Sequence, residues 1–178
     1  MTENTTTWNI DPGHSEAQFR IKHLAITNVN GTFDKFSGYA RTHGDDFNQA
    51  TVHFEIEADS INTNNAPRDN QLKSPDLFNT IQYPKIVFDG KLLQKDGDDY
   101  TLDGELTLLA TKRPISLAAA FTGSGKGRFN DTRAGFEVSG KISRKDYGLS
   151  WNILNEAGGL VIGDEVKLHF DIQLIREA

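Results

Sequence analysis

Asp11, His14 and Ser15 lie within five positions near the N-terminus and combine a carboxylate, an imidazole and a hydroxyl. A nucleophilic hydrolase uses these groups: the carboxylate orients the imidazole, which takes the hydroxyl proton. The chain has no GxSxG elbow, and neighbours in sequence do not by themselves form a triad. We therefore favour a turn held by hydrogen bonds of Asp11 and His14, and predict no catalytic residue. The alternative hypothesis is an enzyme that acts on a lipid or small apolar acid through His14.

His23 is a second candidate, in this case for metal binding. It shares a face with Phe19 and Ile21 in an alternating stretch, where a hydrogen-bonded histidine is a better interpretation than a ligand. The five histidines include no HxH or HExxH pattern, the spacings that place two imidazoles on one metal ion. The sequence therefore predicts neither a metal site nor a catalytic cofactor.

Three further stretches carry groups that could meet a phosphate. Arg68 and Asp69 either orient a ligand's polar head or form a cap or salt bridge at a helix end, and we favour the second interpretation. Lys112 and Arg113 could steer an anionic head such as a phosphate, but we favour a solvated turn as their explanation. Residues 123–128 (GSGKGR) lack the GxxxxGK[ST] spacing and a following helix, so we interpret them as a hairpin loop.

Most of the chain alternates apolar and polar residues in steps of two, the pattern of half-buried β-strands. The parity shifts near Asp34 and Lys35, which predicts a β-bulge. No segment keeps a helical period, and about eight antiparallel strands with one dry face each are expected. The runs cover residues 8–11, 17–23, 32–42, 52–59, 86–92, 100–108, 115–121, 136–143 and 166–174.

Residues 61–84 interrupt the alternation and hold three of the five prolines. Ser74 followed by Pro75 suits a helix N-cap with proline at the first helical position. We predict short helical turns near 67–73 and 75–80 that lie as a lid across one end of the β-structure. A second lid segment is expected near 147–157, where the period is lost again.

One-sided strands must bury their dry faces, either between two sheets or inside a sheet closed on itself. Glycines occur among the apolar, inward-facing positions of the strands, which we call the dry rows, at Gly38, Gly90, Gly104 and Gly140. They favour closure of the sheet because glycine permits sharp bending. The sequence thus predicts an all-β fold, a single eight-stranded antiparallel barrel, with a sandwich as the alternative.

Composition excludes several function classes. A length of 178 residues suits one domain, predicted over residues 8–178 after a frayed, disordered segment 1–7. The net charge of −6 argues against a nucleic-acid partner, and no membrane span is expected. The absence of cysteine excludes disulfides and thiolate metal sites. No signal peptide is recognised, which predicts a cytoplasmic protein, or a periplasmic one if a signal has been removed.

The dry rows are rich in phenylalanine, with eleven in the chain. An eight-stranded barrel is just wide enough to be filled by side chains or to hold one slim ligand. Simple core packing would make the protein a filled interaction module. The small residues in the dry rows and the apolar lid favour a ligand cavity, because glycine and alanine leave room.

Several spaced motifs resemble those of the YceI-like, polyisoprenoid-binding family. The resemblance extends from Trp8 to about Leu174. It departs from the family pattern where Ala110 and Lys112 replace the usual glycine and threonine. The matching stretches are residues 8–15 (WNIDPGHS), 19–24 (FRIKHL), 61–63 (INT), 68–72 (RDNQL), 76–84, 136–148 and 161–166 (VIGDEV).

The resemblance implies a lipocalin-like barrel that binds, transports or stores a long-chain lipid without catalysis. The implied ligand is a polyisoprenoid, of the isoprenoid quinone or polyprenyl phosphate type, or a fatty acid or amide. A homodimer is possible. The predicted ligand-binding residues are His14, Phe19, His23, Phe33, Phe54, Arg68, Asp69, Leu72, Phe78, Phe88 and Phe136.

Overall fold

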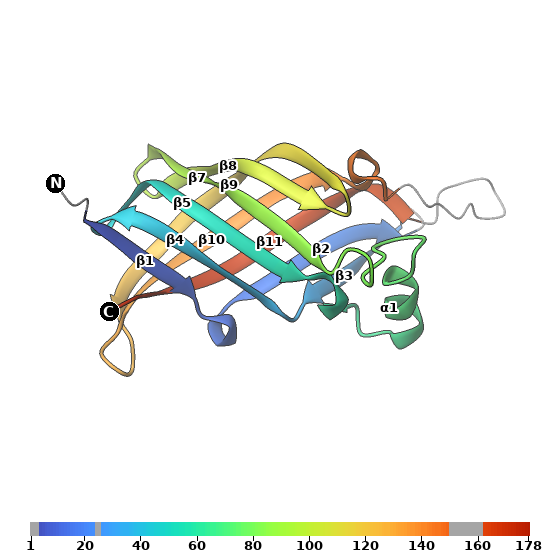
Figure 1. Ribbon diagram of the computed structural model, residues 1–178, viewed down its shortest axis with the longest axis horizontal. Helices are drawn as coiled ribbons and strands as arrows, with labels where there is room; N and C mark the ends of the chain where they lie inside the picture. Colours follow the sequence, from blue (N-terminus) through green and yellow to red (C-terminus); the bar gives the residue numbers. More distant parts are fainter. Residues whose placement is uncertain (1–3, 24–25, 150–161) are drawn as a thin grey trace.

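The computed structural model describes residues 4–23, 26–149 and 162–178. Its strands form one antiparallel sheet in the order β1-β4-β5-β7-β8-β9-β10-β11-β2-β3-β6, and β1 also pairs with β11 (Figure 1). The strands are β1 (Thr5–Ile10), β2 (Glu16–His23), β3 (Thr27–Phe33), β4 (Phe36–His43), β5 (Asp46–Glu57), β6 (Ile61–Asn62), β7 (Lys85–Asp96), β8 (Asp99–Leu108), β9 (Thr111–Lys126), β10 (Thr132–Ser143) and β11 (Ile162–Arg176).

The sheet closes into a barrel of eight strand positions, because three of these positions are divided strands. β1 and β2 both pair with β11, β3 and β4 follow one another along the next position, and β5 continues as β6. The 3-10 turns η1 (Pro12–His14) and η2 (Ala58–Ser60) separate the first and third pairs. The predicted eight-stranded antiparallel barrel is therefore confirmed, and the sandwich is not observed.

Two strand boundaries differ from the prediction. Asp34 and Lys35 do not form a bulge but end one strand before the next begins. The Asp34 amide donates to the Ser60 carbonyl at 3.1 Å, and the Lys35 carbonyl accepts from the Glu57 amide at 2.9 Å. Both residues therefore lie between β3 and β4 and belong to neither strand. At the N-terminus, Thr5 to Thr7 pair with β4, whereas we had expected disorder up to residue 7.

An aromatic plug fills the barrel at the end that carries the N-terminus. We use this name for Trp8, Phe47, Tyr100, Phe121 and Phe136. The Phe136 ring centroid lies 5.1 Å from that of Phe47, 5.4 Å from Phe121 and 5.7 Å from Tyr100. Trp8 is 2% exposed, and its indole nitrogen donates to the Thr42 hydroxyl at 3.0 Å. This end of the barrel is thus closed by packing.

The dry-row glycines allow close packing and do not leave empty space. Gly90 and Gly104 face one another across β7 and β8, and a Cβ atom on either would lie 2.7 or 2.8 Å from the Phe88 ring. A side chain at Gly140 would collide with Leu117. The expectation that these positions leave room was therefore wrong, because large neighbours occupy the space.

The lid helix α1 (Ala66–Leu72) covers the other end of the barrel, away from the N-terminus (Figure 1). The Asn65 side chain caps it by accepting from the Arg68 amide at 3.0 Å. The predicted helical turn at 75–80 is formed by hydrogen-bonded turns over 75–78 and not by a helix, with the Leu77 amide donating to the Ser74 carbonyl at 3.0 Å. It folds back on α1, and the Phe78 amide donates to the Leu72 carbonyl at 2.9 Å.

The second lid segment lies mostly beyond the described part of the chain. The 3-10 turn η3 (Arg144–Tyr147) precedes it and ends at Gly148, whose φ of +84° is left-handed. The remainder of the predicted 147–157 segment, from residue 150, lies outside the described residues. Among the residues that are described, no helix has the length and apolar character needed to cross a membrane.

Candidate functional site

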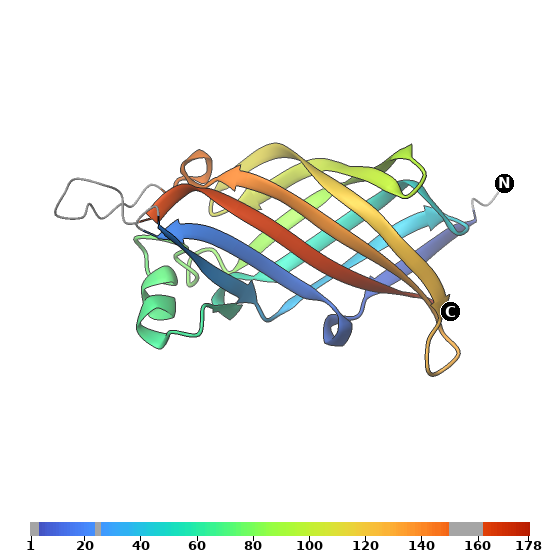
Figure 2. The same ribbon diagram turned by 180° about the vertical axis from the view of Figure 1, so that it is seen from behind.

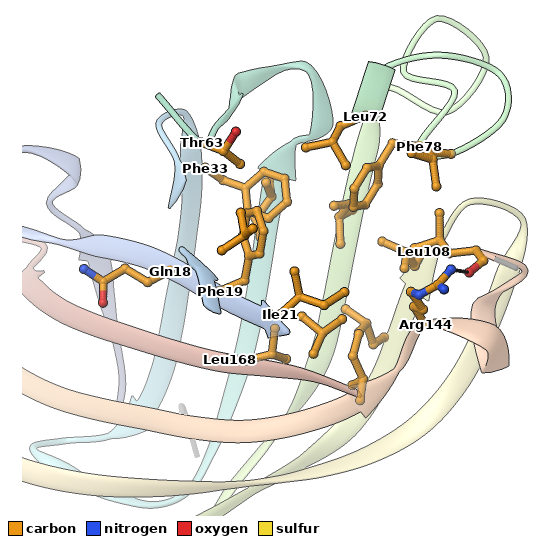
Figure 3. A pocket seen from close by; sticks show the side chains of 18 of the residues that line it. Gln18, Phe19, Ile21, Phe33, Thr63, Leu72, Phe78, Leu108, Arg144 and Leu168 are labelled. Carbon is orange, nitrogen blue, oxygen red and sulfur yellow. Dashed lines mark hydrogen bonds between the residues drawn. The ribbon is translucent and has the colours of Figure 1, made fainter. Parts of the chain in front are cut away.

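An apolar cavity of about 250 Å³ lies inside the barrel beneath the lid (Figure 3). We call this cavity the bore. Its walls come from β2, β3, β5, β7, β8, β10 and β11, because the inward residues of these strands are apolar at every second position. The apolar lining is Phe19, Ile21, Val29, Phe33, Ile56, Leu72, Leu77, Phe78, Ile86, Leu106, Leu108, Ile142, Leu149, Val166, Leu168 and Phe170.

A smaller inner cavity of about 70 Å³ lies next to the bore. Five residues line both cavities: Ile56, Ile86, Leu106, Leu168 and Phe170. The inner cavity also touches Phe88, Leu117 and Val138, which belong to the same packed cluster as the aromatic plug. The two cavities therefore lie in series between the lid and the plug, and we refer to them together as the apolar passage.

Most of the predicted apolar liners lie on this passage. Phe19, Phe33, Leu72 and Phe78 line the bore. Phe54 and Phe88 line the inner cavity, where the Phe54 and Phe170 ring centroids are 5.6 Å apart. Strand alternation predicted the inward direction of Phe19, Phe33, Phe54 and Phe88, because it separates inward from outward residues, whereas Leu72 and Phe78 were predicted from the lid. The same signal could have found Ile56, Leu106, Val166, Leu168 and Phe170, which were not among the predicted ligand-binding residues.

Phe136 is placed differently from its prediction. It packs against Phe47 and Phe121 in the plug and lines neither the bore nor the inner cavity. Its strand pattern is the same as that of the true liners. Whether an inward residue lines a cavity or packs in the plug depends on its position along the barrel axis. The alternating sequence pattern carries no information on that position.

His14 lies away from the bore, on the outer side of η1, with 66% of its side chain exposed. Its Nδ1 is 2.7 Å from Asp11 Oδ2, and the other Asp11 oxygen accepts from the Gly13 amide at 3.0 Å. Arg133 and His14 hold the pKa of the Asp11 carboxyl below its ordinary value. The Ser15 hydroxyl accepts from the Gln173 amide at 2.9 Å. The predicted hydrogen-bonded turn is thus confirmed, and His14 as a ligand-binding residue is not supported by its position.

Arg68 lines the bore, and Asp69 holds the loop beside it. Arg68 Nε donates to the Thr63 hydroxyl and Nη2 to the Thr63 carbonyl, both at 2.7 Å. Asp69 Oδ1 accepts from the Thr63 amide at 2.9 Å and from the Thr63 hydroxyl. Asp69 is therefore a structural residue that fixes Thr63, and Thr63 in turn fixes Arg68. The favoured prediction was a cap or salt bridge at a helix end; Asp69, in the first turn of α1, bonds the Thr63 amide and hydroxyl that precede the helix, and no Arg68–Asp69 ion pair is among the described contacts. His23 lies in β2, but its side chain is outside the described residues.

Arg144 is a lining residue that the sequence analysis missed. It is only 3% exposed, and its Nε donates to the Gly163 carbonyl at 2.9 Å. Its Nη2 lies 3.6 Å from Asp164, and burial lowers the pKa of this guanidinium. Figure 3 shows it on the same side of the bore as Leu108. The available signal was a charged residue at an inward position, because Arg144 follows Val138, Gly140 and Ile142 at every second residue.

The charges at the bore are of one sign. Lys22, Arg68 and Arg144 line it, whereas none of the described lining residues is Asp or Glu. Arg144 lies 3.6 Å from Asp164, so the excess positive charge at the bore comes from Lys22 and Arg68, in a chain whose net charge is −6. The arrangement can hold an apolar chain in the passage and an electronegative head group near the lid.

The fold and the passage define a class of protein: a lipocalin-like β-barrel with an apolar interior site. The model of the YceI-like domain matches residues 8–174, and the chain therefore belongs to the YceI family. Protein YceI of Escherichia coli O17:K52:H18 is 38% identical over 142 residues, which cover 79% of this chain and 73% of that protein.

Two solved structures share the fold. BcnA of Burkholderia cenocepacia has a TM-score of 0.80 at 18% identity, covering 92% of this chain and 98% of that one. A domain of Saccharophagus degradans described as polyisoprenoid-binding has a TM-score of 0.71 at 18% identity, covering 99% and 100%. At these identities both comparisons concern the fold.

Proposed function

We propose that this protein binds and carries a polyisoprenoid or a similar long-chain lipid, with no chemistry of its own. The observation that supports the proposal is the apolar passage beneath the lid, whose inner cavity is lined by apolar residues alone in the described chain. The polyisoprenoid-binding domain with the same fold adds support for this ligand class.

The passage suits a linear apolar molecule better than a compact polar one. Each buried CH₂ group stabilises a complex by roughly 0.8 kcal/mol, so one isoprene unit contributes about 3–4 kcal/mol before ordering costs. Affinity then depends on how much of the lipid's hydrocarbon chain enters the passage. The fit to the apolar walls and the exclusion of water contribute more than hydrogen bonds. No observation favours the alternative of catalysis through His14, which lies outside the barrel. The cavities argue against a filled interaction module.

The direct test is organic extraction and mass spectrometry of untagged protein purified under native conditions. We expect a long-chain lipid in near-stoichiometric amount. A sample stripped of lipid should gain thermal stability when a polyprenol is added, because a ligand that binds only the folded state stabilises it. Recovery of no lipid, together with an unchanged melting temperature on addition of polyprenols and fatty acids, would contradict the proposal.

The head group is expected to be anionic, because Arg68 lines the mouth of the bore and no described carboxylate forms an ion pair with it. Replacing Arg68 with methionine keeps most of the apolar stem but removes the charge. We expect Kd for a polyprenyl phosphate to rise tenfold to a hundredfold, since a hydrogen bond to a charged group contributes about 1.5–3 kcal/mol.

Isothermal titration with a matched pair of ligands separates this effect from general damage. A polyprenol of the same chain length should bind the Arg68→Met variant as it binds the original protein. Arg41→Met, on the exposed surface of β4, is the control substitution and should change neither affinity. Equal losses for phosphate and alcohol would assign Arg68 a structural role and remove the case for an anionic head.

A further inference from the structure

Three side chains that could ligate a metal meet on the outer face of β10 and β11. His169 and Asp171 are two residues apart on β11 and therefore point to the same side of the sheet. Glu137 on β10 lies directly opposite Asp171. The three residues each offer a ligand atom, and these atoms lie within 4.8 Å of one another. His169 Nε2 is 3.2 Å from Asp171 Oδ1.

This group is an imidazole with two carboxylates, which is a ligand set for zinc and related divalent transition-metal ions. Bonds of about 2.0–2.2 Å to such an ion bring its ligand atoms to roughly 3–4 Å from one another. The present spacing therefore needs closure by about an ångström. The exposed Glu137 side chain can supply this by rotation, since its strand holds only its backbone.

The surrounding charges favour a cation at this place. Glu16 on β2 lies opposite Asp171 on its other side, so Glu137, Asp171 and Glu16 form a row of carboxylates across three neighbouring strands. Figure 2 shows these strands side by side, with β10 in orange, β11 in red and β2 in blue. Like charges directly opposite one another destabilise a sheet.

Basic side chains do not neutralise this row. Among the described residues, Asp171 pairs with His169, and no lysine or arginine forms an ion pair with Glu16, Asp171 or Glu137. The corresponding basic row, Lys141, Lys167 and Arg20, is also aligned across the three strands. It lies four residues further along each strand, which is about 13 Å away at roughly 3.3 Å per residue.

A second histidine–carboxylate group on the outer surface shows the contrast. His53 lies 2.6 Å from Asp89 and 3.2 Å from Glu55, and these contacts raise the pKa of His53. Glu55 also pairs with Lys85 at 3.3 Å. This group thus contains its own cation, whereas the carboxylate row on β10, β11 and β2 has none from lysine or arginine in the described chain.

We propose that His169, Asp171 and Glu137 bind one divalent transition-metal ion, with Glu16 beside it and water completing the coordination. The site is independent of lipid binding, because its side chains point outward. The residue between two of the ligands, Phe170, points inward and lines the bore. A failure of the metal proposal would leave the lipid proposal unchanged.

The test is titration of untagged, chelator-treated protein with zinc chloride by calorimetry, followed by cobalt(II) absorption spectroscopy. We expect one zinc ion per chain and a cobalt spectrum of a protein site with a nitrogen ligand. His169→Ala should weaken zinc binding at least about tenfold. Substitution of a residue that only hydrogen-bonds to a metal ligand already causes a loss of this size. Glu137→Gln, which keeps the shape of the side chain, should cause a similar loss.

The control is His53→Ala, which removes an outward histidine from the other carboxylate group and should leave zinc affinity unchanged. Circular dichroism and thermal unfolding establish that each variant is folded, and all three substitutions lie on the outer surface. The proposal is overturned if the original protein binds no zinc, if His169→Ala binds as tightly as the original, or if His53→Ala causes an equal loss.

Discussion

Replacing Val166 with tryptophan is expected to weaken the binding of a long-chain lipid by several hundredfold. Val166 lies on β11 between Ile142 on β10 and Ile21 on β2, and all three line the bore. An indole at this position fills space within a cavity of about 250 Å³. If it displaces one isoprene unit, the loss is about 3–4 kcal/mol, which corresponds to several hundredfold in Kd.

Lys167→Trp is the matched control for this substitution. It introduces the same side chain at the next residue of β11, which is exposed and faces outward. Titration with a polyprenol should show near-original affinity for Lys167→Trp and a large loss for Val166→Trp. Lipid recovered by extraction should fall in the same order. Original affinity in a folded Val166→Trp variant would mean that lipid binds elsewhere than in the bore.

Strand alternation predicted the barrel and most of its lining because a period of two directly encodes the two faces of a sheet. Val166, Leu168 and Phe170 follow one another at every second position of β11, and all three line the bore. The sequence also predicted the location of α1, near residues 67–73, because the alternation in steps of two stops in this stretch. These are local signals, and they needed no knowledge of distant contacts.

The sequence could not predict which end of the barrel is filled. Phe88 and Phe136 occupy equivalent positions in alternating runs, but one lines the inner cavity and the other packs in the plug. Phe47, the central partner of Phe136, lies outside every alternating run that we had recognised. Its contacts come from a strand far away in the chain, and only closure of the sheet brings the two rings together.

The outer histidine group was missed for a different reason. The HxH and HExxH patterns each contain two histidines, whereas His169 is followed two residues later by an aspartate. The third residue, Glu137, is supplied by the neighbouring strand, and its partner is set by the register of β10 with β11. Register depends on the whole sheet, so a single strand does not reveal which residues will meet.

Replacing Phe136 with alanine is expected to destabilise the protein by about 3–5 kcal/mol, the usual cost of removing a buried phenylalanine side chain. Phe136 is 4% exposed and contacts the rings of Phe47, Tyr100 and Phe121. Its removal leaves a cavity that these neighbours fill only in part. The free energy of unfolding, measured by urea denaturation of lipid-free protein, checks the prediction.

Phe78→Ala provides the comparison, because Phe78 borders the bore and is only partly buried. Phe78→Ala should lower the free energy of unfolding by less than about 2 kcal/mol. The Phe78 side chain already faces the open bore on one side, so its removal enlarges that space and creates no new enclosed cavity. Lipid binding should respond in the reverse order, weakening for Phe78→Ala and staying unchanged for folded Phe136→Ala. Equal destabilisation by the two substitutions would contradict a division of the barrel into a packed end and a receiving end. That division decides how deep a lipid can go, because the bore and the inner cavity both lie on the lid side of the plug.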